Sequence, residues 1–149
     1  MVQRSTVRRS TVRRSIVPSL FPPPGYAHTA VVEPGTRLVF LAGGVPLDAD
    51  GELVGPGDRV AQARQVLANL EEALRHAGGT LADVVASTVY VVSAEPGPLS
   101  EVWDVVNASG LAEGPHTSTL LGVACLGYTG QLVEITVTAV VGGDAAVEG

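Results

Sequence analysis

The segment QARQVLANLEEALRHAGGTLADVVASTVYVV, residues 62–92, contains two different apolar periods, and these decide the fold. Around its first part, apolar side chains recur every three or four positions, at Val60, Ala63, Leu67, Leu70 and Leu74. This spacing predicts a helix that begins after Asp58, ends at Gly78–Gly79 and has one apolar face. The second part, VVASTVYVV, is rich in β-branched residues and predicts a largely buried strand.

The helix and the strand are joined by Thr80 and Asp83, whose spacing is a small capping-box signal. The remaining face of the helix is polar and is expected to meet water. Its polar residues are Arg59, Gln62, Glu71 and Arg75.

Further strands and a second helix lie on both sides of this segment. Residues 29–33 and 37–42 flank the turn Glu33-Pro34-Gly35 and are predicted to form a β-hairpin. Residues 98–107 predict the second helix, residues 118–125 and 131–141 predict two more strands, and residues 52–54 are compatible with a short one. The order β-β-α-β-α-β-β indicates an α+β domain whose helices pack on one sheet face. The uncovered apolar face predicts self-association.

Charge is distributed unevenly along the 149 residues. Five arginines precede residue 15, the first acidic residue is Glu33, and the chain contains no lysine. From residue 15 onward, 4 arginines stand against 15 aspartates and glutamates, a net charge of −11. Such an acidic body repels phosphate backbones, which argues against a nucleic-acid partner unless the basic N-terminal arm alone supplies the contacts.

The arm itself begins with the repeat RSTVRRSTVRRSIV, residues 4–17. A period of five suits neither a helix nor a strand, so a weakly ordered tail is expected, with binding to an anionic surface and targeting as alternatives. Four prolines between residues 18 and 24 impose extended backbone. We therefore divide the chain into an arm (1–24), a domain (25–142) and a flexible tail (143–149).

Several functional classes find no support in the sequence. The single cysteine, Cys125, rules out an internal disulfide framework and is expected to pack in a strand. No zinc-binding or phosphate-binding motif occurs. No apolar run approaches the roughly 18–20 residues that span a bilayer, and no secretory signal is recognisable. A soluble, cytoplasmic protein is the expectation.

The last predicted strand contains the most specific chemical feature. Alternation from Gln131 places Glu134 on the same face as Thr136 and Thr138. Glu134 is then either an edge carboxylate facing solvent or a carboxylate in a polar cleft that works as a general acid and base.

Four stretches together resemble the RidA/YjgF family. They are GYAHTAVV, RLVFLAGGVPLD with GELVG, the helix-strand segment quoted first, and STLLGVACLGYTGQLVEI, and they cover about residues 25–141. The resemblance implies a chorismate-mutase-like fold with a mixed sheet, a homotrimer with a central barrel, and small-molecule clefts between subunits. It also implies cofactor-free hydrolysis of imines or enamines, formed from amino acids, to a keto acid and ammonia.

The resemblance further implies which residues form the cleft. Glu134 matches the glutamate that activates water, Tyr26 matches a cleft tyrosine, and Ala42 and Gly43 match the segment before the PLD turn. The arginine that clamps the substrate carboxylate is replaced by Thr117 or Ser118.

Neutral hydroxyls at Thr117, Ser118 and Thr119, with His116 as a further donor or a cation, are therefore the candidate substrate-binding groups. Because a hydroxyl does not replace a charge-assisted fork, a neutral or differently shaped substrate is expected. The alternatives are a noncatalytic, ligand-binding regulatory trimer and, against the acidic charge, a ribonuclease. Trp103 on the second helix is expected to pack in the core or to form a cleft wall.

Overall fold

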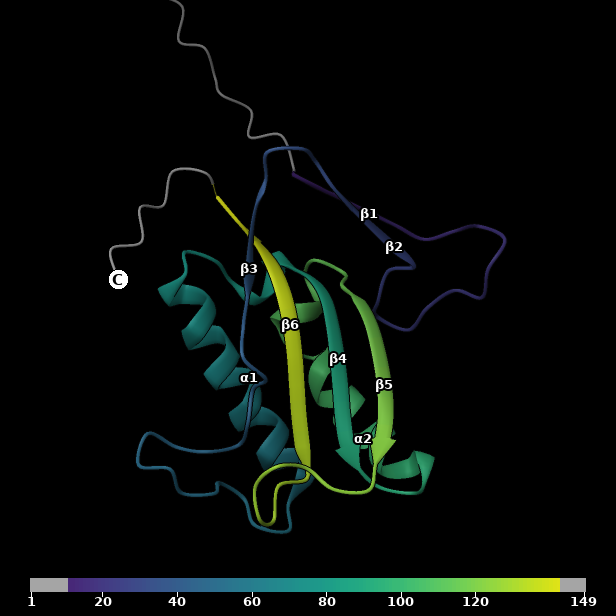
Figure 1. The fold of residues 1–149 in the computed structure, drawn as a ribbon. Coiled ribbons are helices and arrows are strands. Elements are labelled where there is room, and N and C mark those ends of the chain that lie inside the picture. Colours follow the sequence, from purple (N-terminus) through teal and green to yellow (C-terminus); the bar gives the residue numbers. More distant parts are fainter. Residues whose placement is uncertain (1–10, 143–149) are drawn as a thin grey trace, which may run out of the picture.

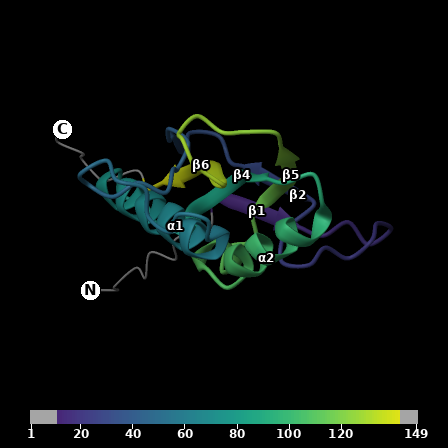
Figure 2. The ribbon, with the colours of Figure 1, turned by 90° about the horizontal axis from the view of Figure 1, so that it is seen from below.

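The structure, a computed structural model, describes residues 11–142. A four-stranded mixed sheet in the order β3-β6-β4-β5 is covered on one face by two helices, and a two-stranded ribbon, β1-β2, lies beside it (Figures 1 and 2). The elements are β1 (Val12–Ser15), β2 (Thr29–Val32), β3 (Arg37–Phe40), α1 (Arg59–His76), β4 (Val84–Val92), α2 (Pro96–Asn107), β5 (Thr117–Val123) and β6 (Val133–Val141). This arrangement confirms the predicted α+β class with both helices on one face.

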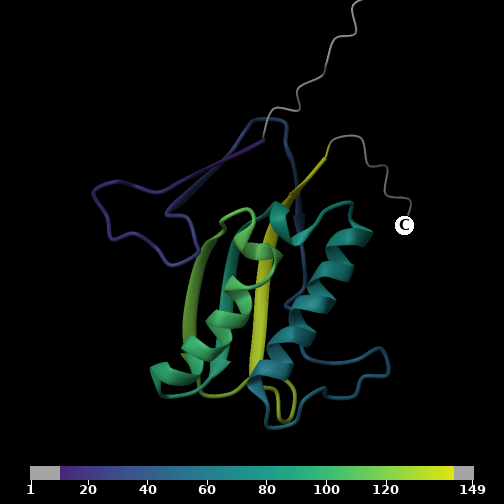
Figure 3. The same cartoon turned by 180° about the vertical axis from the view of Figure 1, so that it is seen from behind.

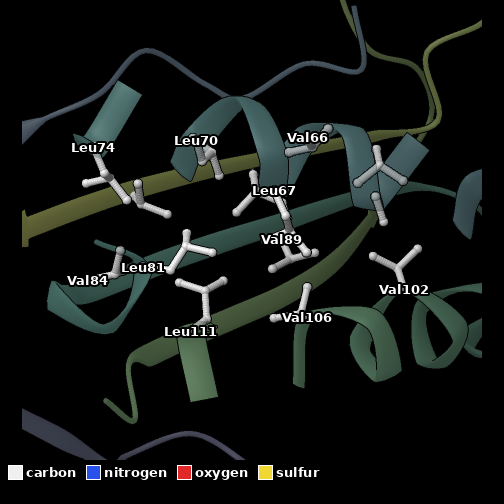
Figure 4. Close-up of a cluster of buried hydrophobic side chains, with 14 of the residues drawn as sticks. Val66, Leu67, Leu70, Leu74, Leu81, Val84, Val89, Val102, Val106 and Leu111 are labelled. Carbon is white, nitrogen blue, oxygen red and sulfur yellow. The ribbon is translucent and has the colours of Figure 1, made fainter. Parts of the chain in front are cut away.

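Helix α1 follows the predicted boundaries because local signals mark both of its ends. The Asp58 side chain accepts a hydrogen bond from the Ala61 backbone nitrogen at 3.0 Å and so caps the first turn. From Ala63 to Leu74 the predicted apolar stripe is buried against the sheet, whereas Val60 is half-buried (Figure 4). The prediction that Gln62 faces water is wrong, because its side chain is fully buried.

Strand pairing defines two distinct sheet faces. Strand β4 pairs parallel with β5 and antiparallel with β6, and Tyr90 lies opposite both Leu121 and Glu134. Alternate residues such as Val89 and Ile135 are buried. They belong to the face of the sheet that the two helices cover, and Figure 3 shows the helices in front of that face. Directly paired residues share a face, so Glu134 points to the side that the helices leave uncovered.

The predicted hairpin between residues 29–33 and 37–42 is wrong. Strand β2 pairs with β1, and β3 pairs with β6 instead. The reason is apolar burial, since Val12 of β1 packs with Val85 and Val140 in a small second core. Residues 52–54 form only an isolated bridge, between Leu53 and Leu47.

The basic arm is built into the fold over residues 11–17, where a weakly ordered tail was expected. Arg14 donates hydrogen bonds from Nη1 to the carbonyls of Val84 and Gly114 at 2.8 Å and of Pro115 at 2.9 Å. Its Nη2 donates to the Ala82 carbonyl at 3.0 Å. One guanidinium thus ties the arm to two separate loops. Residues 1–10 and the predicted tail, 143–149, lie outside the described residues.

Replacing Arg14 with methionine is expected to lower the free energy of unfolding by about 2–3 kcal/mol, because it removes charge-assisted hydrogen bonds to partly buried carbonyls. Arg13→Met is the matched control, since Arg13 only forms a surface ion pair with Glu33 at 2.9 Å and should contribute less than about 1 kcal/mol. Urea denaturation of both variants measures the difference. If both variants lost the same free energy of unfolding, Arg14 would not be the residue that anchors the arm.

The helix-free face carries exposed apolar side chains. Phe40 is 74% exposed and Leu38 is 46% exposed, both at the β3 edge of the sheet. They lie opposite Thr138 and Val140 of β6, on the same face as Glu134. An exposed apolar surface of this kind is typical of an interface, so the predicted trimer remains our expectation. Within residues 11–142, no helix is long and apolar enough to cross a membrane.

Candidate functional site

Glu134 is half-buried on the helix-free face, and a neutral amide holds it in place. Gln131 Nε2 donates a hydrogen bond to Glu134 Oε1 at 3.3 Å and a second one to the Val133 carbonyl at 3.1 Å. Gln131 is buried, so its position is well defined. Among the described residues, no arginine or histidine forms an ion pair with Glu134. The carboxylate is therefore oriented without being neutralised by a cation.

Gly43 lies directly against this carboxylate. Gly44 pairs with Ile135 through two backbone hydrogen bonds, of 2.8 and 3.2 Å, which bring the segment alongside β6. A Cβ atom at Gly43 would lie 3.0 Å from Glu134 Cδ, closer than a side chain tolerates without movement. Glycine at this position leaves room beside the carboxylate, and Ala42 next to it is exposed.

Thr117 and Thr119 share the face of Glu134 but lie at a distance from it. Thr117 is opposite Ala86, which in turn is opposite Thr138. Four residues of β6 separate Thr138 from Glu134, roughly 13 Å along the strand, and two strand spacings add roughly 10 Å across. The Thr117 hydroxyl donates to the Val85 carbonyl at 2.9 Å, and Thr119 is exposed. One chain does not bring these hydroxyls to a small molecule that touches Glu134.

Tyr26 lies in a different place from Glu134, in a pocket of about 220 Å³. Ser118, which alternates with Thr117 and Thr119, points to the helix-covered face at this pocket. The Tyr26 ring meets the Trp103 ring edge to face, with centroids 6.0 Å apart, and Trp103 Nε1 donates to the Pro24 carbonyl at 3.0 Å. Trp103 is thus a pocket wall. The pocket is lined by Pro24, Tyr26, Trp103, Ser118 and Leu120.

His116 is buried behind this pocket rather than exposed to a substrate. Its side chain is 0% exposed, and its ring stacks on Trp103 with centroids 5.8 Å apart and an interplanar angle of 17°. Nδ1 is 2.6 Å from Ser87 Oγ, and Ser87 Oγ donates to Ser118 Oγ at 2.8 Å. Nε2 is buried and has no hydrogen-bond partner in the described part of the chain.

The charge of His116 follows from this burial. Loss of hydration lowers its pKa from 6.5 to about 4, and the nearby Arg14 guanidinium adds to the effect. His116 is therefore neutral at pH 7. The hypothesis that it supplies a cation is not supported, and any part it plays must be as a neutral hydrogen-bonding group.

The depressed pKa makes stability depend on pH in a defined window. Below pH 6.5 the unfolded chain protonates at His116 while the folded protein does not, so stability is lost as the pH falls from 6.5 to about 4. The contribution of this one group is about 3 kcal/mol at its largest.

We expect His116→Gln to remove this part of the pH dependence, and His76→Gln, at an exposed position, to retain it. Urea denaturation at several pH values measures the difference between each variant and the wild-type protein. If the free energy of unfolding of His116→Gln fell with pH as steeply as that of the wild-type protein, the burial of a neutral imidazole would be contradicted.

Arg14 is a cation near the start of β5, where the resemblance places an arginine. Its four hydrogen bonds, however, all go to backbone carbonyls, including those of Gly114 and Pro115. The guanidinium holds the loop before β5 and is not available as a bidentate clamp for a carboxylate. A cationic clamp is thus missing from the described residues around Thr117 and Ser118.

Two further expectations concern metals and Cys125. Within residues 11–142, no group of three His, Cys, Asp or Glu side chains is placed to hold a metal ion. Cys125 is exposed and lies beyond the end of β5. The expectation that it packs in a strand is therefore wrong, because the strand ends at Val123.

Sequence reasoning missed Ser87 and Gln131. Ser87 is a polar residue on the helix-covered face of β4, two positions before Val89, and this break in the apolar pattern was a usable signal. Gln131 precedes β6 and gave no signal, since its role depends on side-chain direction at a strand start.

The comparisons with known proteins agree with this fold. A family model described as endoribonuclease L-PSP matches residues 21–141. A Rid-family protein of unknown function from Yersinia pestis is 38% identical, with a TM-score of 0.81 over 89% of this chain and 100% of that chain. RidA from an Antarctic Psychrobacter is 25% identical, with a TM-score of 0.62 over 89% of this chain and 100% of that chain.

A curated relative adds an activity to the comparison. The 3-aminoacrylate deaminase RutC from Acinetobacter baylyi is 35% identical over 79 residues, which cover 51% of this chain. The match spans 60% of the length of that relative.

Proposed function

The chain belongs to the RidA/YjgF (Rid) family, and from this premise we propose that it hydrolyses a small imine or enamine to a carbonyl compound and ammonia. The observation that carries the proposal is the placement of Glu134. Its carboxylate is half-buried, oriented by Gln131 and in close contact with the Gly43 backbone. A positioned carboxylate of this kind suits general acid and base chemistry on water.

The proposed reaction needs only this carboxylate and water. Water attacks the carbon of a protonated imine while Glu134 takes one of its protons, and the C=N electron pair moves to nitrogen. Glu134 then returns this proton to the amino nitrogen of the carbinolamine. The C–N bond breaks as the hydroxyl oxygen forms the C=O bond, and the released ammonia takes the hydroxyl proton and leaves as ammonium.

We propose that the complete site lies between two copies of the chain. Thr117 and Glu134 lie too far apart in one chain to share a small ligand, yet both are on the helix-free face. Phe40 and Leu38 make the same face apolar at the β3 edge. A trimer that buries this face supplies a cleft with Glu134 from one subunit and the β5 hydroxyls from its neighbour, as the family resemblance implies.

The substrate class follows from the absence of a cationic clamp. Thr117 or Ser118 supplies a hydroxyl where the resemblance implies an arginine, Arg14 is engaged by carbonyls, and His116 is neutral. A buried carboxylate without a cation loses interactions worth several kcal/mol. We therefore propose that the preferred substrate is neutral at the position where related substrates carry a carboxylate.

The test measures ammonia release from two freshly generated imines. One carries a carboxylate, and the other carries a neutral amide at the same position. We expect the wild-type protein to show a higher kcat/KM for the neutral imine, because that imine does not have to desolvate an unpaired carboxylate. Faster turnover of the carboxylated imine would contradict the proposed substrate class.

A second candidate is a noncatalytic, ligand-binding trimer, and the missing arginine favours it. In that case the same neutral compounds should raise the melting temperature without being consumed, because a ligand selective for the folded state stabilises it by mass action. Consumption of the ligand would exclude this candidate. The name of the family model raises ribonuclease activity as well, but the net charge of −11 from residue 15 onward opposes RNA binding.

A further inference from the structure

Two amide side chains of helix α1 bind backbone segments on either side of Glu134. Gln62 and Asn69 are seven positions apart, which places them on one side of the helix, about 10 Å apart along its axis. Gln62 is 0% exposed, and Asn69 is half-buried. A buried amide destabilises a protein unless it is hydrogen-bonded. The positions of their hydrogen-bond partners therefore indicate what the two amides do.

Gln62 fixes the backbone on both sides of Gln131. Its Oε1 accepts a hydrogen bond from the Leu132 nitrogen at 2.7 Å, and its Nε2 donates to the Gly130 carbonyl at 3.1 Å. Gln131 lies between these two residues and donates from Nε2 to Glu134 Oε1 at 3.3 Å. The position of the Gln62 amide is thus transmitted to the carboxylate through a single residue.

Asn69 fixes the segment that lies against the carboxylate from its other side. Its Nδ2 donates to the carbonyls of Val45 and Leu47, both at 2.8 Å. Its Oδ1 accepts from Gln65 Nε2 at 2.9 Å, which determines the orientation of the amide. Both carbonyls follow closely after Gly43, whose backbone is in contact with the carboxylate.

Gly44 shows how tightly this segment is packed between α1 and β6. Its backbone nitrogen and carbonyl form hydrogen bonds with Ile135 of β6, at 2.8 and 3.2 Å. A Cβ atom at Gly44 would lie 2.8 Å from Leu70 Cγ and 3.0 Å from Val66 Cγ1, and both of these side chains belong to α1. The position of the helix therefore sets the position of the segment relative to β6.

We propose, on the basis of the hydrolysis proposed above, that Gln62 and Asn69 are positioning residues for Glu134. Both belong to α1, which covers one sheet face, whereas Glu134 points to the other face, so neither amide reaches the substrate. Gln62 acts through Gln131 on Oε1 of the carboxylate. Asn69 acts through the Gly43 segment on the opposite side. Together they hold the carboxylate where it takes a proton from water, and a displacement of about 1 Å at such a group lowers the rate about 10²-fold.

Gln62→Met tests the first of these roles, because methionine keeps the length of the side chain and removes its hydrogen bonds. Leu74→Ala is the control, since Leu74 is also fully buried on α1 and its truncation destabilises the fold through a cavity. We expect Gln62→Met to lower kcat for imine hydrolysis about 10- to 100-fold and to change KM less than about threefold. Leu74→Ala should leave kcat of the folded protein unchanged. An unchanged kcat in Gln62→Met, or equal losses in the two variants, would overturn the proposal.

Asn69→Leu is the second variant, because its half-buried site tolerates an apolar side chain better than the position of Gln62 does. We expect a loss of kcat of about 3- to 10-fold. Combining each substitution with Glu134→Gln separates positioning from a general effect on the fold. Residues that act as a unit are not additive, so neither substitution should lower the residual rate of Glu134→Gln further. A loss by the same factor in both backgrounds would contradict the positioning role.

Hydrogen exchange tests the same geometry without any turnover. Gln62→Met should speed exchange of the Gln131 side-chain amide protons, and Asn69→Leu should speed exchange of the Ile135 backbone amide. Each rate, measured relative to that of the Val89 amide in β4, should rise about 3- to 10-fold. Leu74→Ala should change neither ratio. Unchanged ratios in Gln62→Met and Asn69→Leu would contradict the proposed positioning.

The two measurements distinguish failure of this proposal from failure of the proposed hydrolysis. If the exchange ratios rise as expected and the wild-type protein hydrolyses no imine, the two amides hold the carboxylate in place but the proposed function is wrong. If imine hydrolysis depends on Glu134 while kcat and the exchange ratios do not respond to either amide, only the positioning role is wrong.

Discussion

Replacing Glu134 with glutamine is expected to lower kcat/KM for imine hydrolysis by about 10²- to 10⁴-fold, the usual contribution of a general acid and base. Glutamine has nearly the same shape, and its amide oxygen still accepts the hydrogen bond that Gln131 donates to Glu134 Oε1. The variant should therefore keep its fold while losing the group that takes a proton from water. Ammonia release under initial-rate conditions measures the effect.

The control for this variant is another carboxylate. Glu113 is exposed and follows the short 3-10 helix Gly110–Ala112, away from β6. Glu113→Gln should leave turnover unchanged. Both variants should unfold at the wild-type urea concentration and sediment as the wild-type protein does. Full activity in a folded Glu134→Gln variant would rule out the proposed mechanism.

Introducing an arginine at Thr117 should restore the missing clamp. Thr117 begins β5 on the face of Glu134, and its side chain is half-buried. A guanidinium there offers a bidentate contact to a carboxylate. We expect Thr117→Arg to raise kcat/KM for the carboxylated imine about 10- to 100-fold, the value of a charged hydrogen bond. The kcat/KM for the neutral imine should not increase.

Thr117→Gln is the matched control, because glutamine has a long polar side chain without the charge. It also loses the hydrogen bond from the Thr117 hydroxyl to the Val85 carbonyl, as the arginine variant does. A gain for the carboxylated imine in both variants would attribute the effect to size instead of charge. No gain in a folded, oligomeric Thr117→Arg variant would show that β5 does not meet the substrate carboxylate.

The local sequence pattern predicted the parts of the fold that depend on residues close together in the sequence. The stripe around Leu70 and the β-branched run of β4 needed only helix and strand periods. The alternation that puts Glu134 with Thr136 and Thr138 is confirmed by the register of β6 against β4. These features depend on residues within a few positions of one another.

Other parts depend on partners that are distant in sequence. Gln62 is buried because its amide accepts from the Leu132 nitrogen at 2.7 Å and donates to the Gly130 carbonyl at 3.1 Å, about seventy residues away. Arg14 binds carbonyls 68 to 101 residues away. A single sequence contains no signal for such pairings, which is why the order of the arm was mispredicted.

The candidate site was likewise predicted only in part. Glu134 and Gly43 were predicted together, and the structure places them in contact. Tyr26 was predicted in the same cleft, but within one chain it lies with Trp103 and Ser118 on the other sheet face. In the proposed trimer a second copy of the chain would join the two groups, and the geometry between copies is not encoded in any local pattern.

The most direct test is a competition experiment with the wild-type protein. Equal amounts of a carboxylated imine and its neutral amide counterpart are offered together, and both carbonyl products are followed over the same interval. A cleft that contains the Glu134 carboxylate and no cationic clamp should consume the neutral imine first. Preferential consumption of the carboxylated imine would show that a cation reaches the substrate, and the account of this site would be wrong.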